Sequence, residues 1–278
     1  MDYKLVCIDM DGTLLNSNKK VTEETKKVLL EARNKGVKIA ISTGRIYNNA
    51  AFYSKYIGLN SPVIAANGAI IKDVNDKEIY KGVIGYDTCK KVLEVLKKYK
   101  MKPNFHTHNS IFCGGILEKL FIYLFITRGI PSDYKVKLYS VKDNEWDKVL
   151  LDNQSEILKC ISIHTSKEVV KKVREELKQI KGIEVSSSNM LNIEINAESV
   201  CKGKGVEILG EKLGIKKEEI IAIGDNENDL TMIEYAGLGV AMGNAPQFIK
   251  DKADYITATN NQEGVSKVIR KFILKENI

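Results

Sequence analysis

The stretch KLVCIDMDGTLL, residues 4–15, decides the fold of this chain. Its apolar first half predicts a buried strand, and two carboxylates, Asp9 and Asp11, follow with one residue between them. Residues two apart in an extended segment point the same way, so both carboxylates can face one point. Burying carboxylates is unfavourable unless a positive group meets them. The stretch therefore predicts a polar site at the end of a buried strand, with a positive partner.

The pattern of a strand followed by a helix recurs along the chain. Further apolar strands are predicted over residues 37–43, 62–67 and 219–225, with helical periodicity after the first and third of them. Thr22 is expected to cap the first helix, which has two glutamates in its first turn. This alternation indicates an α/β fold with a mostly parallel sheet.

The middle of the sequence breaks this pattern. From about residue 86 to 192, helices mix with strands of alternating polarity, which indicates an inserted α+β domain. We expect this insert at residues 84–193, between the two parts of the first domain at 1–83 and 194–278.

Composition excludes several classes of protein. The most apolar segment, LFIYLFI at residues 120–126, is far too short to span a membrane, and we expect a core helix there. The N-terminal apolar run does not resemble a signal peptide. Five scattered cysteines without a CxxC pair favour a reducing, cytoplasmic location over a disulfide framework or zinc site. The net charge of +7 comes from lysines interspersed with glutamates, which favours a solvated surface over nucleic-acid binding.

Three of the predicted strands end in polar residues. Asp9 follows the first, Thr43, Gly44 and Arg45 lie at the end of the second, and Asp225 follows a third. Ligands of open α/β sheets bind at the carboxyl ends of the strands, so we expect these side chains in one crevice. Carboxylates without a neighbouring histidine or cysteine point to Mg²⁺ as the positive partner.

A carboxylate, a magnesium ion and a second carboxylate suit phosphoryl transfer. One carboxylate can attack phosphorus, giving an aspartyl-phosphate that water hydrolyses. The second can protonate the leaving oxygen and then activate the water. Gly12 permits a tight turn close to phosphate, Thr43 can donate to a phosphoryl oxygen, and a lysine would balance the charge.

The sequence resembles the haloacid dehalogenase superfamily, and within it the Cof-type phosphatases. The resemblance rests on these motifs: DMDGTLL at 9–15, STGR at 42–45, ANGAII at 66–71, VCKGKGVEIL at 200–209, GDNENDLTMI at 224–233, AMGNAP at 241–246 and EGV at 263–265. It implies a Rossmann-like core with a large inserted cap that selects the substrate. It also implies a Mg²⁺-dependent phosphatase of small phosphomonoesters, either phosphosugars or a phosphorylated cofactor.

The resemblance assigns roles to residues of this chain. It implies Asp9 as nucleophile, Asp11 as general acid and base, Thr43 as the phosphate-binding hydroxyl, and Lys202, with Lys204 as the alternative, as the active-site lysine. The implied metal ligands and the other implied contacts to phosphate or substrate are the following: Asp9, Asp11, Asp225 and Asp229 for Mg²⁺, with Asn228 in support; Gly12, Thr43, Gly44, Arg45, Asn67, Gly68, Lys202 and Asn228 for phosphate or substrate.

Some readings stay open at this point. A phosphomutase or phosphotransferase would share the first half-reaction, and a sensor of phosphorylated metabolites would bind without turnover. His106 and His108 are candidates for metal or substrate contacts but are more often strand or surface residues. The expected partner is a small phosphorylated metabolite rather than nucleic acid or a membrane. The hinges of the cap are expected near 83–86 and 191–196.

Overall fold

The chain folds as two compact units in the computed structural model, which describes residues 2–124 and 130–276. The first unit comprises Met1–Gly44, Tyr53–Tyr80 and Cys201–Ile278. The second comprises Arg45–Phe52 and Lys81–Val200, so that it contains the whole of the predicted insert and, in addition, a short segment after the second strand.

The first unit is built on an eight-stranded sheet in the order β14-β13-β12-β1-β2-β3-β4-β5. Adjacent strands from β14 to β3 run parallel, and β4 pairs antiparallel with β3. The strands are β1 (Leu5–Ile8), β2 (Lys38–Ser42), β3 (Val63–Ala65), β4 (Ile70–Lys72), β5 (Glu78–Lys81), β12 (Ile220–Gly224), β13 (Leu238–Ala241) and β14 (Tyr255–Ile256). The predicted α/β fold with a mostly parallel sheet is confirmed.

Local sequence signals explain where the helices of this unit begin and end. Thr22 caps α1 by accepting a hydrogen bond from the amide of Thr25, and Glu23 and Glu24 occupy the positive end of the helix. Gly214 ends α7 in the left-handed conformation. The helices that include residues of this unit are α1 (Glu23–Asn34), α2 (Tyr47–Tyr56), α7 (Lys202–Leu213), α8 (Leu230–Tyr235), α9 (Gln247–Lys250) and α10 (Gly264–Ile269).

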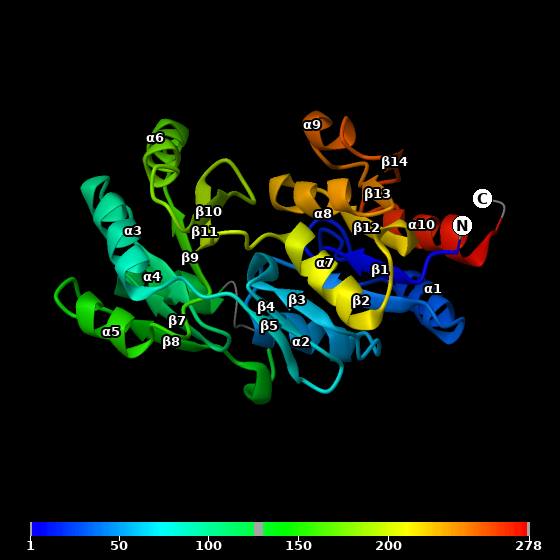
Figure 1. Cartoon of the computed structure of the whole chain (residues 1–278), viewed down its shortest axis with the longest axis horizontal. Coiled ribbons are helices and arrows are strands. Elements are labelled where there is room, and N and C mark those ends of the chain that lie inside the picture. Colours follow the sequence, from blue (N-terminus) through cyan, green and yellow to red (C-terminus); the bar gives the residue numbers. More distant parts are fainter. Residues whose placement is uncertain (1, 125–129, 277–278) are drawn as a thin grey trace. The chain divides into compact units, whose positions relative to one another are not determined.

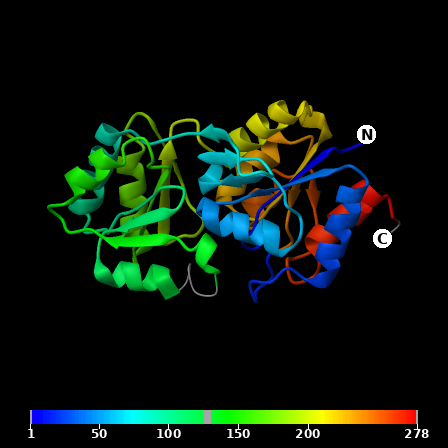
Figure 2. The ribbon, with the colours of Figure 1, turned by 90° about the horizontal axis from the view of Figure 1, so that it is seen from below.

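Helices cover both faces of the parallel sheet, as Figures 1 and 2 show. On one face, α7 and α8 pack over strand residues such as Leu5, Ala40 and Ala222. On the other face, α1 packs against α10 and β2. The central strand β1 is completely buried, because every residue of Leu5–Ile8 is covered by one helical layer or the other.

The second unit is a six-stranded sheet in the order β10-β11-β9-β6-β7-β8, with every pair antiparallel except β7 and β8. Helices α3, α5 and α6 share with the sheet one apolar core, in which Phe105 contacts Trp146. The bounds of the elements are α3 (Tyr86–Lys98), β6 (Asn104–His106), β7 (Ser110–Cys113), α4 (Ile116–Ile122), β8 (Lys137–Ser140), α5 (Trp146–Asp152), β9 (Lys159–Ile163), α6 (Lys167–Leu177), β10 (Ile183–Ser186) and β11 (Asn192–Ala197).

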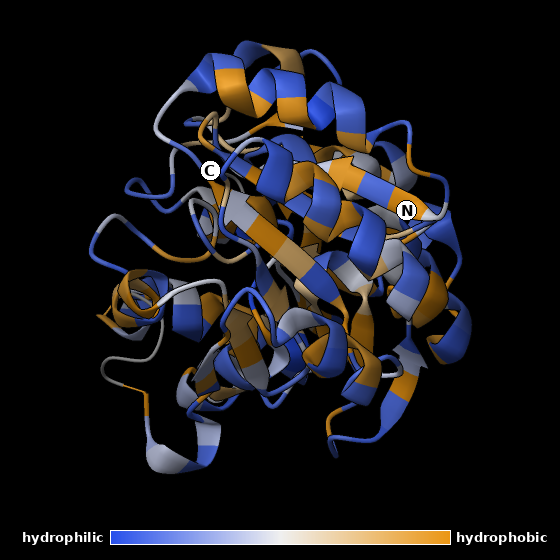
Figure 3. Cartoon of the chain, turned by 90° about the vertical axis from the view of Figure 1, so that its left-hand side faces the viewer, coloured by the Kyte–Doolittle hydropathy of each residue, from blue (hydrophilic) through white to orange (hydrophobic). Residues whose placement is uncertain are grey.

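The described part of the apolar segment, residues 120–124, does not form the expected core helix. Helix α4 covers its first residues and buries Ile122, but Leu120 and Phe121 are each more than half exposed, and residues 125 and 126 lie outside the described part of the chain. Apolar and polar residues alternate along the helices in Figure 3. Within residues 2–124 and 130–276, no helix combines the length and the apolar character that crossing a membrane requires.

The face of the second sheet opposite α3, α5 and α6 carries buried polar side chains on β6, β9 and β11, while α4 packs on the same face at β7 and β8. Because side chains alternate along a strand, Phe105, Cys160 and Ile195 point into the helical core while their neighbours point the other way. Lys159 and Glu194 lie on this polar face, are almost fully buried, and form an ion pair of 2.5 Å. Each charge is therefore compensated within the same sheet.

We predict that breaking this ion pair destabilises the second unit. Lys159→Met leaves the buried Glu194 carboxylate without its ammonium partner and should lower the free energy of unfolding by about 3–5 kcal/mol. The double variant Lys159→Met, Glu194→Gln carries no charge and should regain at least half of that loss. Denaturant unfolding followed by fluorescence of Trp146, the chain's one tryptophan, measures both. A double variant as unstable as the single one would contradict the charge argument.

Candidate active site

A sharp turn at the carboxyl end of β1 presents the first carboxylate of the site. The Asp9 amide donates to the Ile223 carbonyl, so the parallel ladder with β12 extends to this residue. The chain then turns so tightly that the amide of Leu14 donates back to the Asp9 carbonyl. Gly12 makes this possible with a φ of +86°, and a Cβ at this position would lie 2.4 Å from the Asp225 carboxylate.

The first residue of helix α7 delivers a lysine to Asp9. The Lys202 ammonium donates to Asp9 Oδ1 at 2.6 Å and to Asp229 Oδ1 at 2.5 Å, and its side chain is 1% exposed. Two glycines let the helix approach closely: a Cβ on Gly203 would lie 2.4 Å from the Thr231 carbonyl, and one on Gly205 would lie 2.6 Å from Ile64. The helix therefore lies near enough to α8 and β3 for Lys202 to reach the strand ends.

Two more carboxylates come from the end of β12. Asp229 Oδ2 accepts hydrogen bonds from the amides of Asp225 and Asn226, which locks the turn into the following helix. Asp225 Oδ1 accepts a hydrogen bond from the Thr13 hydroxyl at 2.8 Å. Oxygen atoms of Asp9, Asp225 and Asp229 all lie within 4.8 Å of one another, and all three residues are buried.

The electrostatics of this carboxylate cluster, Asp9, Asp225 and Asp229, are unbalanced. Burial, followed by the charges of Asp229 and Asp225, raises the pKa of Asp9 well above its usual range despite Lys202. Burial, followed by the charge of Asp229, raises the pKa of Asp225 to about 7. Burial opposes the charge of Lys202, but Asp229 and Asp9 outweigh it and hold the lysine pKa above its usual range. When all three carboxylates are ionised, the one ammonium of Lys202 leaves excess negative charge, which a divalent cation would balance.

A second group of candidates lies along the ends of β2 and β3. Thr43 is buried, its amide donates to the Ile64 carbonyl, and its carbonyl accepts from the Asn67 amide. Asn67 adopts a left-handed φ of +59°, and its side-chain oxygen accepts from Asn228 at 3.2 Å. This hydrogen bond joins the turn after β3 to the turn after β12, which is the turn that bears Asp225 and Asp229.

Three candidates differ in position from the carboxylate cluster. The Asp11 side chain is half-exposed and pairs with Lys19 at 2.9 Å. Lys204, the alternative to Lys202, is exposed and pairs with Glu207 at 2.6 Å. Arg45 belongs to the second unit, where its guanidinium donates to the side chain of Asn49 at 2.7 Å. The structure thus places Lys202 rather than Lys204 against Asp9.

A family model of haloacid dehalogenase-like hydrolases matches residues 6–269, nearly the whole chain. The chain belongs to this family. It is 35% identical over 275 residues to a 5-amino-6-(5-phospho-D-ribitylamino)uracil phosphatase of Bacillus subtilis, a match that covers 99% of this chain and 97% of that protein.

Solved structures agree with this assignment. A haloacid dehalogenase-like hydrolase of Bacteroides thetaiotaomicron superposes with a TM-score of 0.81 at 27% identity, covering 97% of this chain and 99% of the other. A subclass IIB sugar phosphatase of the same superfamily also has a TM-score of 0.81 at 27% identity, covering 97% and 98% of the two chains. The chain is therefore a hydrolase of the haloacid dehalogenase family, and its relatives include named phosphatases.

The histidine candidates lie in the second unit of this hydrolase. His106 is 4% exposed on the polar face of the sheet, and its Nδ1 has no hydrogen-bond partner among residues 2–124 and 130–276. His108 Nδ1 lies 3.6 Å from a carboxylate oxygen of Glu156. Neither histidine belongs to a cluster of metal-ligating side chains, since the one such cluster within the described residues is that of Asp9, Asp225 and Asp229.

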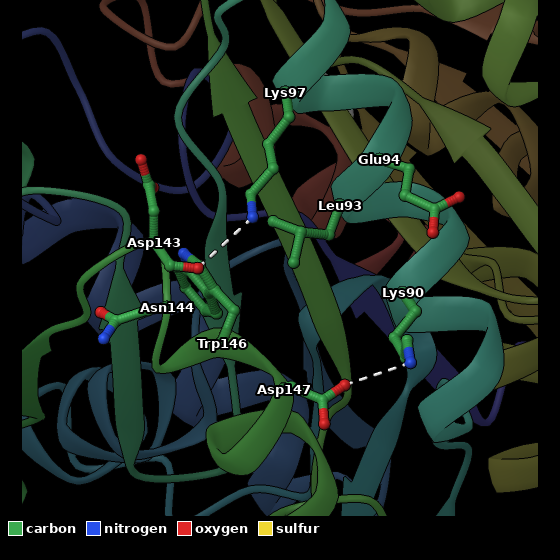
Figure 4. A pocket seen from close by; sticks show the side chains of 8 residues that line it. All are labelled: Lys90, Leu93, Glu94, Lys97, Asp143, Asn144, Trp146 and Asp147. Carbon is green, nitrogen blue, oxygen red and sulfur yellow. Dashed lines mark hydrogen bonds and ion pairs between the residues drawn. The ribbon is translucent and has the colours of Figure 1, made fainter.

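A surface hollow of about 190 Å³ in the second unit is a poor candidate site. It lies between α3 and α5 and, as Figure 4 shows, its lining lysines already face acceptors. Lys90 pairs with Asp147 at 3.1 Å, and Lys97 donates to the Asp143 carbonyl at 3.4 Å. These contacts satisfy the charges that would otherwise recruit a ligand.

Sequence reasoning missed two contacts in the first unit. Thr13 was part of the DGT motif, but nothing in the sequence placed its hydroxyl on Asp225. Asn244, in AMGNAP, donates to the Gly12 carbonyl at 2.9 Å and lies 3.5 Å from Asp225 Oδ2. The motif itself was the one available signal, because the contact joins segments more than 200 residues apart in the chain.

We predict a large loss of stability when Lys202 is replaced and a small one when Lys204 is replaced. Lys202→Met leaves the buried carboxylate cluster without its ammonium and should lower the free energy of unfolding by about 3–5 kcal/mol at neutral pH. Lys204→Met removes only an exposed ion pair and should change it by less than about 1 kcal/mol. Denaturant titrations of the metal-free proteins compare the two. Equal losses would show that Lys202 does not compensate the cluster.

His106 predicts a pH dependence of stability. Burial, followed by the charge of Lys159, lowers the pKa of His106 from 6.5 to about 3. The unfolded chain therefore binds one more proton than the folded chain between these values, so stability should fall as the pH drops from 6.5 towards 3. His106→Asn should remove about 2 kcal/mol of the loss between pH 6.5 and 4.5, when Trp146 fluorescence follows unfolding.

A matched control for this experiment is His164→Asn. His164 lies just beyond the end of β9 and is only partly buried. The slope of stability against pH for His106→Asn is compared with that of His164→Asn and of the wild type, and an unchanged slope for His106→Asn would refute the prediction.

Proposed function

We propose that this protein is a Mg²⁺-dependent phosphatase that hydrolyses small phosphomonoesters through an aspartyl-phosphate on Asp9. The observation that carries the proposal is the buried carboxylate cluster with Lys202 between Asp9 and Asp229. A site of this kind suits an anionic substrate only if a cation offsets the carboxylates, and its relatives named as phosphatases point to the same reaction class.

The donor set of the cluster fits magnesium. Carboxylate oxygens are the ligands that hard divalent cations prefer, and no histidine or cysteine belongs to the cluster within the described residues. Asp9 and Asp225 would hold the ion, with the Asp11 carbonyl as a further ligand and Asp229 in support. When bound, Mg²⁺ would shield the repulsion between carboxylate and phosphate and stabilise charge on the phosphoryl oxygens.

The first half-reaction transfers the phosphoryl group to the enzyme. A carboxylate oxygen of Asp9 forms a bond to phosphorus while the bond between phosphorus and the ester oxygen breaks. Asp11 gives its proton to the leaving oxygen, so the product departs as an alcohol.

The second half-reaction restores Asp9. Asp11, now ionised, takes a proton from water as the water oxygen bonds to phosphorus, and the bond between phosphorus and Asp9 breaks to release phosphate. Most of the groups that we propose to hold the phosphoryl oxygens lie in the turns that follow the strands of the first unit, and Lys202 lies at the start of α7. The groups are the Lys202 ammonium, the Thr43 hydroxyl, and the turns of Gly12, Gly44, Asn67, Gly68 and Asn228. Arg45, which directly follows Gly44 in the chain, is proposed as a further phosphate contact.

The substrate class is a small phosphorylated metabolite. A relative of 35% identity is named for a phosphorylated ribitylamino-uracil, and a structural neighbour of 27% identity is named a sugar phosphatase. Both names describe a phosphate ester of a polyol or sugar, so we propose a phosphorylated polyol or sugar for this chain. Five free cysteines suit a cytoplasmic location, which we propose as well.

Phosphate release from a panel of compounds tests the function. The panel should contain sugar phosphates, 5-amino-6-(5-phospho-D-ribitylamino)uracil, nucleotides and pyridoxal phosphate, assayed with Mg²⁺ and with chelator. We expect metal-dependent release that falls at least about 1,000-fold in Asp9→Asn, because the nucleophile is lost. Asp251→Asn, the same change at an exposed aspartate on the end of α9, is the matched control and should stay active.

The competing outcomes have distinct signatures. Release that is unaffected by chelator or by Asp9→Asn would sink the proposed mechanism. Transfer of phosphate to an added sugar, in place of release, would identify a phosphotransferase. Binding of phosphorylated compounds without release or transfer would identify a sensor.

A further inference from the structure

A chain of amide side chains links two loops that flank the carboxylate cluster of the first unit. The Asn244 side-chain nitrogen donates to the Gly12 carbonyl at 2.9 Å, and the Asn244 side-chain oxygen accepts from the backbone amide of Asn260 at 3.0 Å. The side-chain nitrogen of Asn260 in turn donates to the Leu15 carbonyl at 2.9 Å. The loop after β1 is thus held at two points by the segment that follows β13 and β14.

The same link continues to the far end of the loop after β1. Asn261 and Ser17 exchange two hydrogen bonds, one from the Ser17 amide to the Asn261 oxygen at 3.0 Å and one from the Asn261 nitrogen to the Ser17 hydroxyl at 2.8 Å. These contacts involve neither Gly12 nor Asp225. Asn261 therefore anchors the same loop without contacting the carboxylate cluster.

Asn244 differs from Asn261 in what it holds. Its nitrogen also lies 3.5 Å from Asp225 Oδ2, while Thr13 donates to Asp225 Oδ1 at 2.8 Å. The Gly12 backbone lies so close to Asp225 that a Cβ there would be 2.4 Å from Oδ2. Asn244 and Thr13 thus flank the two oxygens of one carboxylate, and Asn244 fixes the turn beside it.

The side chain at this position must both donate and accept. A carboxamide can donate to the Gly12 carbonyl and accept from the Asn260 amide at once, which an aliphatic or carboxylate side chain cannot do. Asn244 is exposed, so water can satisfy the freed groups when it is removed. Its loss should therefore change the position of the turn and of Asp225 more than the stability of the fold.

We propose that Asn244 is a positioning residue that sets the affinity of the site for a divalent cation by fixing Gly12 and Asp225. The inference rests on the proposed metal site and deepens it. It assigns a function to the AMGNAP motif, which the reaction itself leaves without a role. Asn244 acts through Asp225 and the Gly12 turn and takes no part in bond making or breaking.

The test compares the same substitution at both ends of the amide chain. Asn244→Leu keeps the size of the side chain and removes its hydrogen bonds, and Asn261→Leu does the same at the Ser17 end. Titration calorimetry with Mg²⁺ alone measures binding without reference to turnover. Asn244→Leu removes the hydrogen bond that fixes the Gly12 turn, so we expect Mg²⁺ binding to weaken about 3- to 10-fold, the equivalent of one hydrogen bond. Asn261→Leu should leave Mg²⁺ binding unchanged.

Two further readouts separate positioning from general damage. The melting temperature of metal-free Asn244→Leu should stay within about 3 °C of the wild type. With the best substrate of the phosphatase panel, the Mg²⁺ concentration for half-maximal rate should rise more than kcat at saturating Mg²⁺ falls.

The outcomes distinguish this inference from the proposed function. Equal Mg²⁺ affinity in Asn244→Leu and wild type, or equal weakening in both leucine variants, would overturn the role of Asn244. Wild-type protein that binds Mg²⁺ but releases no phosphate would overturn the phosphatase alone, and the calorimetry would still decide on Asn244. Wild-type protein without Mg²⁺ binding would overturn both.

Discussion

Compensation of buried negative charge is the constraint on which the first unit depends. The parallel sheet brings the carboxyl ends of β1 and β12 together, and with them Asp9, Asp225 and Asp229. Carboxylates this close and this buried repel one another, and one ammonium from Lys202 offsets only part of that repulsion. The Thr13 hydroxyl donates to Asp225 and backbone amides donate to Asp229, and these hydrogen bonds stabilise the remaining negative charge.

The second unit also contains buried charges, but there a buried cation is paired with a buried anion. Lys159 and Glu194 are as deeply buried as the charges of the first unit, but they occur as one cation and one anion in direct contact. The neighbouring His106 stays neutral because burial keeps its pKa low. A balanced pair needs no ion from solution, whereas an excess of carboxylates does. The contrast supports the proposal that the chemistry takes place in the first unit.

Much of the fold could be predicted because its signals are local. Apolar runs of strand length, the Thr22 cap and the alternation of strand and helix all act over a few residues, and together they predict a parallel α/β sheet. The same logic predicts that Asp9, Thr43 and Asp225 lie at one edge of the sheet, and the structure adds that β1 and β12 are neighbours. The roles given to these residues stay predictions, because geometry alone does not establish a reaction.

The remaining features depend on contacts that the sequence does not reveal. Lys202 and Lys204 each begin a Lys-Gly pair, and the family resemblance favours Lys202 without showing its contacts. Residues two apart on a helix face different directions, and the packing of α7 brings Lys202 to Asp9. The exposure of Leu120 and Phe121 on α4 contradicts their apolar character, so pattern reasoning placed that helix in a core. Asn244 lies at the end of a contact that spans most of the chain.

The close approach of α7 has a consequence for how far this protein can be stabilised. Glycine within a helix is less favourable than alanine by about 1 kcal/mol, so Gly203 and Gly205 would ordinarily be sites for stabilising substitution. Here a methyl group at either position would collide with Thr231 or Ile64 and push the helix outward, taking Lys202 with it. Helix α7 is thus less stable than it would be with alanine at these two positions. The two glycines are required because only a closely packed helix lets the Lys202 ammonium contact Asp9.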